Sequence, residues 1–272
     1  MLVQQKERCR AAHFWVLVAP QRHVLFEYTR DHTSAAVDEI LGDYQGCLVA
    51  DAHAVYDHLY ATGDVIEVNC WAHVRRYFFK AMGSDPERAK VALGFIGSLF
   101  RIERALADAP RRKKEKMREK RSGHIVDAFF SWSDAEAPSV LDDTPIAAGI
   151  RYARNQRVRL AKFIEDGRLP IHNNMSGLAL RREAVGRKNW LFVGSDDGGA
   201  VNATFTSLLA SAQLCKIEPW AYLRDLFCLL SNWPAHQMLD LAPLNWAQTS
   251  ARKDVRALLA ANKFRDLTID AG

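Results

Sequence analysis

The sequence predicts a mixed α/β fold near its start and a mostly helical structure beyond it. Over the first 70 residues, short runs of aromatic and β-branched residues alternate with helix-spaced segments, which is typical of a mixed sheet. From His73 onward, apolar residues recur at helical spacing for about a hundred residues. A length of 272 residues suits one large domain with a small appendage.

The first predicted element is a β-hairpin. Residues 13 to 18 (HFWVLV) form a continuous apolar run, and Pro20 interrupts it. Residues 22 to 28 then alternate between apolar and polar side chains. Two such runs across a tight break predict a pair of antiparallel strands.

A helix and two strands are predicted after the hairpin. Residues 34 to 44 have helical spacing, and Ser34 or Thr33 can cap their start. Residues 46 to 50 and 65 to 68 are expected to be short buried strands.

Asp51 directly follows the first of these strands. A carboxylate at the carboxyl end of a central strand lies where open α/β sheets bind their ligands. The alternative role for Asp51 is an N-cap for the segment after it.

A long helical segment is predicted next. Asp85 followed by Pro86 indicates an N-cap and a first helical position, and residues 146 to 164 are expected to form a further helix. The residues expected to face the core here are Val91, Phe95, Leu99, Ile102, Ile125, Val126, Phe129 and Phe130.

Residues 111 to 121 (RRKKEKMREKR) carry most of the excess charge. They hold eight basic and two acidic side chains, a balance of +6, whereas the whole chain has a net charge of +5. Such a run fits contact with a nucleic-acid backbone. The alternative is a solvated helix face, and the rest of the chain favours nucleic acid.

The last third is expected to be helical with one edge strand at residues 190 to 193. A helix is predicted over residues 200 to 216, Pro219 opens a last compact unit, and the tail beyond Thr249 is expected to be an exposed helix. The residues expected inside are Val201, Phe205, Leu208, Leu209, Ala212, Tyr222, Leu223, Leu226, Phe227 and Leu230.

Cysteine usage and hydropathy favour a cytoplasmic protein. The five cysteines are scattered and never spaced Cys-x-x-Cys, which argues against a disulfide framework. Cys70 and His73 have metal-ligand spacing, but no second pair is placed to complete a zinc site. No apolar run approaches the roughly 20 residues of a membrane helix.

Several motifs resemble the DDE transposases of the insertion-sequence-66 family. They are LVADAHAVYD at 48 to 57, CWAHVRRYF at 70 to 78, the asparagine pair followed by GRKNWLFVGSDDGG up to 199, EPWAYLRDLF at 218 to 227, and LAPLNW at 241 to 246. The similarity runs from about Phe14 to Trp246. CWAH-x-RR and GRKNW-x-F, far apart and in this order, are specific signals.

The resemblance implies a ribonuclease-H-like mixed sheet with a long helical insertion and a small helical C-terminal element. We therefore expect a transposase central domain over residues 1 to 212, with its insertion at about 80 to 166. The C-terminal element is expected at 213 to 255, and a polar tail at 256 to 272.

The resemblance also implies DNA strand cleavage and transfer by two Mg²⁺ ions held by three carboxylates. Asp51 matches the second carboxylate. The third is a glutamate separated from the paired asparagines by two residues and followed by arginine; those positions hold Gly177 and Leu178. Glu183 lies six residues later, about 9 Å along a helix, and is not expected to substitute.

The first carboxylate of the family lies on a strand ahead of the hairpin, and the opening MLVQQKERCR has no aspartate. The sequence is therefore expected to be a truncated, degenerate transposase. An alternative is a non-catalytic DNA-binding protein that competes with the intact enzyme for element ends. A third hypothesis is an active enzyme whose true start lies upstream of Met1.

DNA is the expected partner, and the protein is expected to form a homo-oligomer or to associate with intact transposase. The residues expected to contact DNA are Arg187, Lys188, Arg181, Arg75, Arg76, His73, Asn173 and Asn174. The alternative for these cations is solvation or core capping, which we favour for Arg182. For His73 a structural hydrogen bond to the adjacent loop is an equal alternative to binding a phosphate or a metal-bound water.

Overall fold

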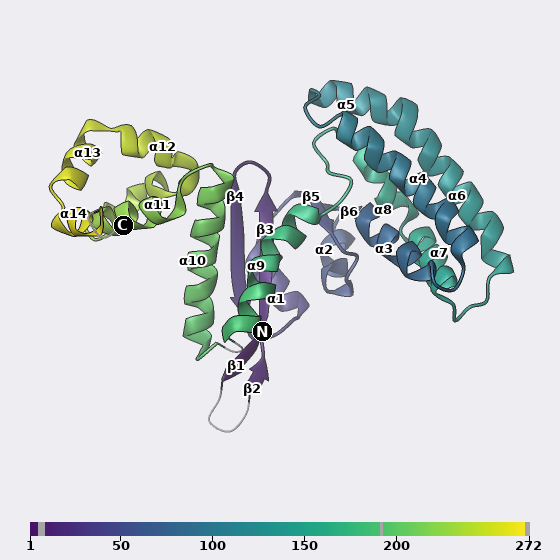
Figure 1. Ribbon diagram of the computed structural model, residues 1–272, viewed down its shortest axis with the longest axis horizontal. Coiled ribbons are helices and arrows are strands. Elements are labelled where there is room, and N and C mark those ends of the chain that lie inside the picture. The colour runs from purple at the N-terminus through teal and green to yellow at the C-terminus, as the bar shows by residue number, and fades with distance from the viewer. Residues whose placement is uncertain (5–8, 191–192, 270–272) are drawn as a thin grey trace. The chain divides into compact units, whose positions relative to one another are not determined.

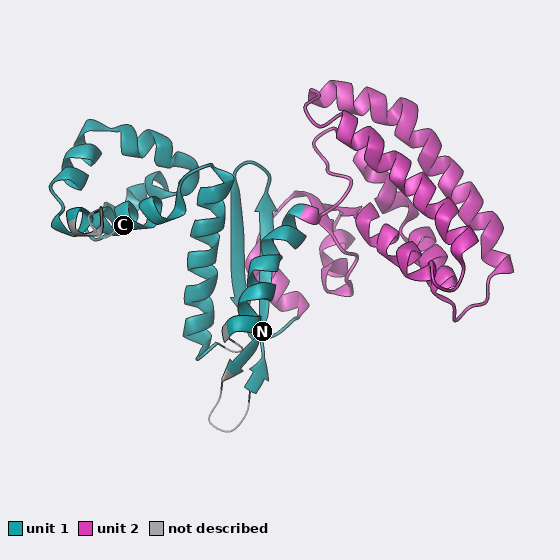
Figure 2. Ribbon diagram, in the orientation of Figure 1, with its two compact units in different colours: residues 1–32, 175–272 teal, residues 33–174 magenta. Residues whose placement is uncertain are grey.

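The computed structural model describes residues 1–4, 9–190 and 193–269. The chain divides into two compact units, which Figure 2 colours separately. Unit 1 combines residues 1–32 with residues 175–272, and unit 2 is the continuous segment 33–174. Each unit is described by itself below.

Unit 2 begins with a small parallel sheet. Strands β5 (Gly46–Ala50) and β6 (Val65–Asn69) run side by side, with Ala50 opposite Asn69. Helix α1 (Ser34–Leu41) precedes them, capped by the Thr33 hydroxyl, and η1 (Ala54–Tyr56) and α2 (Asp57–Ala61) connect them. Both predicted strands and the predicted helix are confirmed.

The remainder of unit 2 is a helical bundle (Figure 1). A π-helical turn joins α5 to α6, so that these two helices form one continuous rod. Its elements are α3 (Trp71–Ala81), α4 (Pro86–Ala105), α5 (Arg111–Met117), η2 (Arg118–Ser122), α6 (Gly123–Glu136), η3 (Ala137–Ser139), α7 (Pro145–Asn155), α8 (Arg157–Ala161) and η4 (Lys162–Ile164).

Aromatic side chains fill the core of this bundle. Trp71 is fully buried, meets Phe129 edge to face with 5.3 Å between ring centroids, and donates its indole N–H to the Leu160 carbonyl at 2.8 Å. The predicted cluster of Val126, Phe129 and Phe130 is confirmed as buried. Burying this much apolar area is the main stabilisation of the bundle.

Two helical predictions are wrong in detail. Helix α4 turns Ala89, Ala92 and Ile96 toward the core, and Val91 is 45% exposed. Alanines allow close helix contact, so the inward face does not follow the largest side chains. The helix predicted over residues 146 to 164 is broken at Gln156, between α7 and α8.

Unit 1 contains two hairpins followed by helices. The predicted hairpin is confirmed as β3 (His13–Ala19) and β4 (His23–Thr29), antiparallel with Val16 opposite Phe26. The other elements are β1 (Leu2–Gln4), β2 (Cys9–Ala11), α9 (Asn174–Trp190), α10 (Asp196–Leu214), α11 (Pro219–Leu230), η5 (Ala235–Leu241), α12 (Pro243–Ala251), α13 (Lys253–Ala260) and α14 (Lys263–Ile269).

Helix α10 lies along strand β4 and bonds to its backbone (Figure 1). The Ser211 hydroxyl accepts from the Val24 N–H and donates to the Val24 carbonyl, both at 3.0 Å. The Ser207 hydroxyl accepts from the Phe26 N–H at 2.7 Å, and its one proton faces the Ala203 carbonyl at 2.7 Å and the Phe26 carbonyl at 3.3 Å. The helix thereby satisfies the outer edge of the hairpin, which otherwise offers unpaired groups to another strand.

Two other predictions for unit 1 are corrected. Helix α9 continues through Trp190, so no strand begins there; Val193 makes a single parallel bridge with Val3, and residues 191–192 lie outside the described part. Val201 and Phe227 are 53% and 49% exposed instead of buried.

The tail is also less exposed than predicted. Val255 and Leu259 of α13 are buried in one cluster with Tyr222 and Trp246, whose rings meet edge to face at 5.1 Å. This cluster is the apolar core of the C-terminal helices.

The mixed α/β class is confirmed, with helices predominating. Among the described residues the strands form three two-stranded sheets, β1 with β2, β3 with β4, and β5 with β6. The single ribonuclease-H-like sheet and the domain limits at residues 212 and 255 stay predictions. No described helix is long and apolar enough to cross a membrane.

Candidate functional site

Asp51 lies at the carboxyl end of the parallel sheet in unit 2. Because Ala50 pairs with Asn69, the chain after β5 emerges at the same edge as the turn from β6 into α3. The next residue, Ala52, has a φ of 50°, a left-handed conformation that costs a non-glycine residue about 1 kcal/mol. The cap of the following turn is His53, whose Nδ1 accepts from Val55, so Asp51 is not that cap.

His73 faces the same region from the first turn of α3. It is half-buried, and its Nδ1 has no hydrogen-bond partner within the described part of the chain. Burial lowers the pKa of His73, Arg76 lowers it further, and Asp51 opposes both. Asp51, His73 and Arg76 therefore form one electrostatic neighbourhood, in which the imidazole favours its neutral form.

Tyrosines next to Asp51 complete this neighbourhood. Burial raises the pKa of Tyr56 to about 12, with the charge of Asp51 adding to the effect. Burial likewise raises the pKa of Tyr152, to which Asp51 also contributes. Both phenols therefore stay protonated at neutral pH, whereas Asp51 itself is exposed.

The asparagine pair follows a segment bound to the start of α3. The Trp71 N–H donates to the Ile171 carbonyl at 3.1 Å, and the Asn173 N–H donates to Cys70 Sγ at 3.4 Å. Burial raises the pKa of the Cys70 thiol, which keeps it a neutral acceptor. Asn173 is thus brought close to the turn that carries His73.

The side chains around Asp51 do not fit a two-magnesium centre. In the described ranges, no group of three or more His, Cys, Asp or Glu side chains is placed to hold a metal ion. Magnesium in such centres needs several oxygen ligands. The charge of Asp51 instead acts on the His73 imidazole and on the phenols of Tyr56 and Tyr152, none of which is an acidic oxygen ligand at neutral pH.

Helix α9 carries the position of the third carboxylate. At about 100° per residue, Asn174, Gly177, Arg181 and Lys188 share one stripe along this helix, and all four are exposed. A Cβ added to Gly177 would meet nothing within 4 Å. A longer side chain therefore has room at this position.

Glu183 lies on the opposite side of α9. It is 6% exposed, and its carboxylate accepts from Thr206 Oγ1 at 3.1 Å and from Asn202 Nδ2 at 3.4 Å, both on α10. Burial raises the pKa of Glu183, and these two hydrogen bonds oppose the shift. Glu183 points into unit 1, so it is not available beside Gly177.

The predicted DNA-contacting cations are exposed, and they are divided between the units. Arg75 and Arg76 belong to α3 in unit 2, where Arg75 lies 5.9 Å from the centre of the Phe79 ring. Arg181, Arg187 and Lys188 belong to α9 in unit 1. Arg182 donates to Gln213, in agreement with a structural role.

The acidic end of the GRKNW motif has a structural role that the sequence did not reveal. Asp196, at the start of α10, binds Arg10, accepts from the Tyr28 hydroxyl at 2.5 Å, and pairs with Arg30 at 2.8 Å. A Cβ on Gly199 would lie 2.5 Å from the Tyr28 ring, so only glycine allows this approach. These contacts join residues over 160 positions apart, which no local pattern reports.

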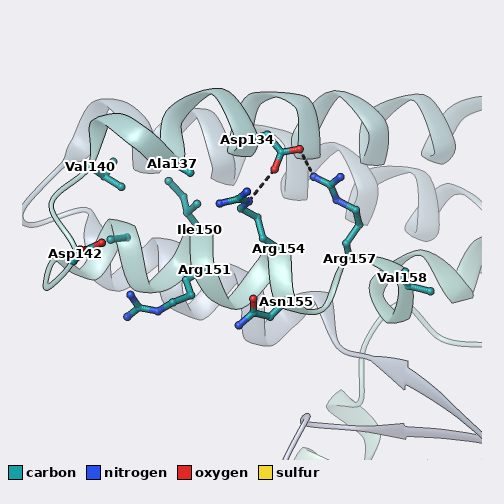
Figure 3. Close-up of a pocket in the computed structure, with 11 residues that line it drawn as sticks. Asp134, Ala137, Val140, Asp142, Ile150, Arg151, Arg154, Asn155, Arg157 and Val158 are labelled. Carbon is teal, nitrogen blue, oxygen red and sulfur yellow. Dashed lines mark hydrogen bonds and ion pairs between the residues drawn. The ribbon is translucent and has the colours of Figure 1, made fainter.

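Unit 2 also has a surface groove that the sequence did not predict (Figure 3). Its volume is about 720 Å³, and it is lined by residues of α6, α7 and α8. Asp134 pairs with Arg154 at 2.8 Å and with Arg157, and Arg157 also lies 4.7 Å from the centre of the Phe130 ring. One carboxylate therefore pairs with both arginines and offsets one of their two positive charges.

Comparison with known proteins identifies the family. The sequence model described as "Transposase IS66 family" matches residues 1–201, well over half of the chain. The chain belongs to the IS66 transposase family. The matched segment includes Asp51, His73 and the whole of α9.

Three relatives of this IS66-family protein come from Sinorhizobium fredii, and all are described as uncharacterized. Protein y4qI is 28% identical over 232 residues, covering 82% of this chain and 43% of the relative. Protein y4hP is 24% identical (92% of this chain, 50% of the relative), and protein y4jD is 23% identical (89% and 50%). The chain thus spans about half the length of the curated relatives it matches. No solved structure matches it.

Proposed function

We propose that this IS66-family chain is a transposase-derived protein that binds DNA without performing strand cleavage and transfer. The proposal rests on the exposed stripe of α9 formed by Asn174, Gly177, Arg181 and Lys188. Glycine occupies the position where the family resemblance places a metal-binding glutamate, and the cations Arg181 and Lys188 follow it along the same stripe.

The orientation of Glu183 supports the loss of chemistry. It is the one carboxylate of α9, and its hydrogen bonds to α10 hold it in the interior of unit 1. A rotation of α9 about its axis that brought Glu183 to the exposed stripe would break those hydrogen bonds and expose the apolar contacts around them. Asp51 is then left with cationic and neutral neighbours in unit 2.

The exposed cations support the retention of DNA binding. Arg181, Arg187 and Lys188 extend into solvent from α9, and Arg75 and Arg76 do so from α3. Solvent-exposed arginine and lysine side chains bind phosphate oxygens of DNA and release the counterions of those phosphates. Asn173 and Asn174 would add hydrogen bonds to sugar or phosphate groups.

The test uses the purified protein, Mg²⁺ and supercoiled DNA that carries the ends of the element encoding the chain. We expect a mobility shift of this DNA but no nicking above the level of the Asp51→Asn variant. Mg²⁺-dependent nicking by the natural protein that disappears in Asp51→Asn would refute the proposed loss of chemistry. Absence of any shift would refute DNA binding.

A second function follows if binding is specific for element ends. A protein that occupies these ends without cutting them would inhibit an intact transposase of the same family. The observation in its favour is the combination of free cations and Gly177 on one helix face. Adding the chain to a reaction of an intact enzyme should then reduce cleavage in proportion to end occupancy.

A further inference from the structure

The basic run 111–121 divides into two opposite sides of one helical rod. One side is anchored to unit 2. Arg111 pairs with Glu115 at 2.7 Å and with Asp166 at 3.3 Å, and Lys114 donates to the Ala107 carbonyl at 2.9 Å.

Arg118 is the central anchor. It is 2% exposed and binds both oxygens of Glu103, at 2.6 and 2.8 Å. It also donates to the carbonyls of Phe163 and Asp166, at 2.7 and 2.9 Å. The π-helical turn that starts at Arg118 places both Arg118 and Ser122 inside unit 2.

A close contact fixes how far the rod can rotate. Gly167 lies so near α5 that an added Cβ would be 2.4 Å from the Arg111 carbonyl oxygen, and its N–H donates to Glu115 at 3.1 Å. With this side held, the orientation of the opposite side is determined by helix geometry.

The opposite side, which we call the five-cation face, consists of Arg112, Lys113, Lys116, Lys120 and Arg121. All five are exposed, and none of their side chains makes a hydrogen bond or ion pair to another residue in the part of the chain that the structure describes. Arg112, Lys116 and Lys120 are four residues apart, so they follow one another along the rod. Glu119 is the one exposed acidic residue of the run.

This arrangement opposes folding of the helix. Like charges four residues apart destabilise a helix by a few tenths of a kcal/mol per pair, and the acidic residue that could compensate, Glu115, is used on the anchored side. Solvated surfaces usually intersperse both signs, whereas this face concentrates one. A polyanion laid along the rod would remove the repulsion between these cations. Its regularly repeated charges would match the repeated spacing of Arg112, Lys116 and Lys120.

We infer that the five-cation face of α5 and η2 binds the phosphate backbone of duplex DNA. The inference rests on the proposed DNA-binding function and assigns a site for it outside α3 and α9. Binding would be independent of base sequence, because lysines and arginines in a row reach phosphates and no groove-reading element accompanies them. An anionic membrane fits less well, because the opposite side of the rod is occupied by buried ion pairs rather than by exposed apolar residues.

The test compares two full-length variants that each lose four exposed cations. The first is Arg112→Gln, Lys113→Gln, Lys116→Gln and Lys120→Gln. The control is Lys216→Gln, Lys253→Gln, Arg256→Gln and Lys263→Gln, in exposed positions of unit 1. Fluorescence anisotropy with a labelled duplex of random sequence measures the dissociation constant as a function of salt.

We expect the natural protein and the control to behave alike. Each lost phosphate contact lowers the slope of log K against log salt by about 0.9, so the first variant should lose about three to four units of slope. Between about 50 and 200 mM salt, the natural protein should weaken about 100-fold more than this variant. The variant Lys113→Arg, Lys116→Arg and Lys120→Arg should retain the natural slope.

The outcomes separate this inference from the proposed function. If the natural protein binds DNA and the first variant keeps the control's slope and affinity, the inference is wrong and the proposed function stands. If the natural protein binds no duplex, both fail. Binding to phosphatidylserine vesicles in place of DNA would also overturn the inference. Thermal melting of each variant checks that the fold is retained.

Discussion

Arg118 shows how a charged residue can serve as a core residue. Its guanidinium has a bidentate partner in Glu103 and two carbonyl partners, and it lies 5.4 Å from the centre of the Phe163 ring. These contacts satisfy most of its five N–H donors within unit 2. Truncation therefore leaves a carboxylate and two carbonyls without their donor.

We predict that Arg118→Met lowers the free energy of unfolding by about 3 kcal/mol or more, because one partner of a buried ion pair is removed. Chemical denaturation of the purified variant measures the loss. Arg112→Met, at an exposed position of the same rod, is the matched control and should change stability by less than about 0.5 kcal/mol. Equal effects of the two substitutions would contradict the anchoring role.

Glu183 predicts a dependence of stability on pH. Burial raises its pKa in the folded protein, so the folded state holds this proton more tightly than the unfolded state. The resulting stabilisation is complete below the unfolded pKa of about 4.3 and is lost as pH rises through the folded pKa. At neutral pH the ionised Glu183 carboxylate therefore lowers the free energy of unfolding.

The Glu183→Gln variant removes this titration. We predict that its unfolding free energy, relative to the natural protein, increases as pH rises from about 4 to 7. Urea denaturation of both proteins across this range measures the difference. A difference that stays constant with pH would show that Glu183 does not titrate with a raised pKa in the folded state.

At the scale of elements, the bond between helix α10 and strand β4 depends on two hydroxyls. Removing them takes the hydroxyl partners from the N–H groups of Val24 and Phe26 and from the Val24 carbonyl, and each buried group left unsatisfied costs about 1–3 kcal/mol. We predict that Ser207→Ala with Ser211→Ala lowers the free energy of unfolding by about 2 kcal/mol or more. It should also increase aggregation, because the strand edge is no longer satisfied.

Thr204→Ala in the same helix is the control for this pair. The Thr204 hydroxyl is exposed and bonds only its own helix, at the Ala200 carbonyl. Alanine there should leave stability within about 0.5 kcal/mol of the natural value. A double serine variant as stable as this control would mean that the side-chain bonds to the strand add nothing.

The elements that could be predicted from sequence are those with a local signal. Strands β5 and β6 are apolar runs between turns, and helix α4 has Asp85 and Pro86 at its start. On α4, Leu99 is buried as predicted, but the exposure of Val91 could not be predicted from side-chain size, because Ala89 and Ala92 face the core instead. Of the strand expected at residues 190 to 193, Trp190 is helical despite its β-prone composition, and residues 191–192 lie outside the described part.

In the candidate site, too, the features with a local sequence signal could be predicted, and those that depend on distant contacts could not. The place of Asp51 at a strand end follows from local pattern alone, as does the exposed state of the α9 cations. The burial of Arg118 and the convergence on Asp196 depend on contacts between distant segments. A run of eight cations gives no sign of which ones face inward.

At the scale of the whole molecule, the two units differ in continuity. Unit 2 is one uninterrupted segment with its own aromatic core, whereas unit 1 needs both ends of the chain. We predict that residues 33–174, expressed alone, fold and melt in one cooperative transition. Circular dichroism during heating measures this, and a fragment without a transition would show that its core depends on unit 1.

The contact of α10 with β4 also shows how many residues of a strand edge a helix can bond. Four helical residues advance about 6.0 Å, and two strand residues advance about 6.4 to 6.8 Å, so the two repeats drift apart by about half an ångström per step. The contacts of Ser207 and Ser211 tolerate this drift. Four helical residues beyond Ser211, the Cys215 thiol reaches the Arg22 carbonyl at 3.6 Å. One step the other way, the helix offers Ala203 and no bond. A helix can therefore bond to the edge of a strand only over a few residues before the two repeats lose register.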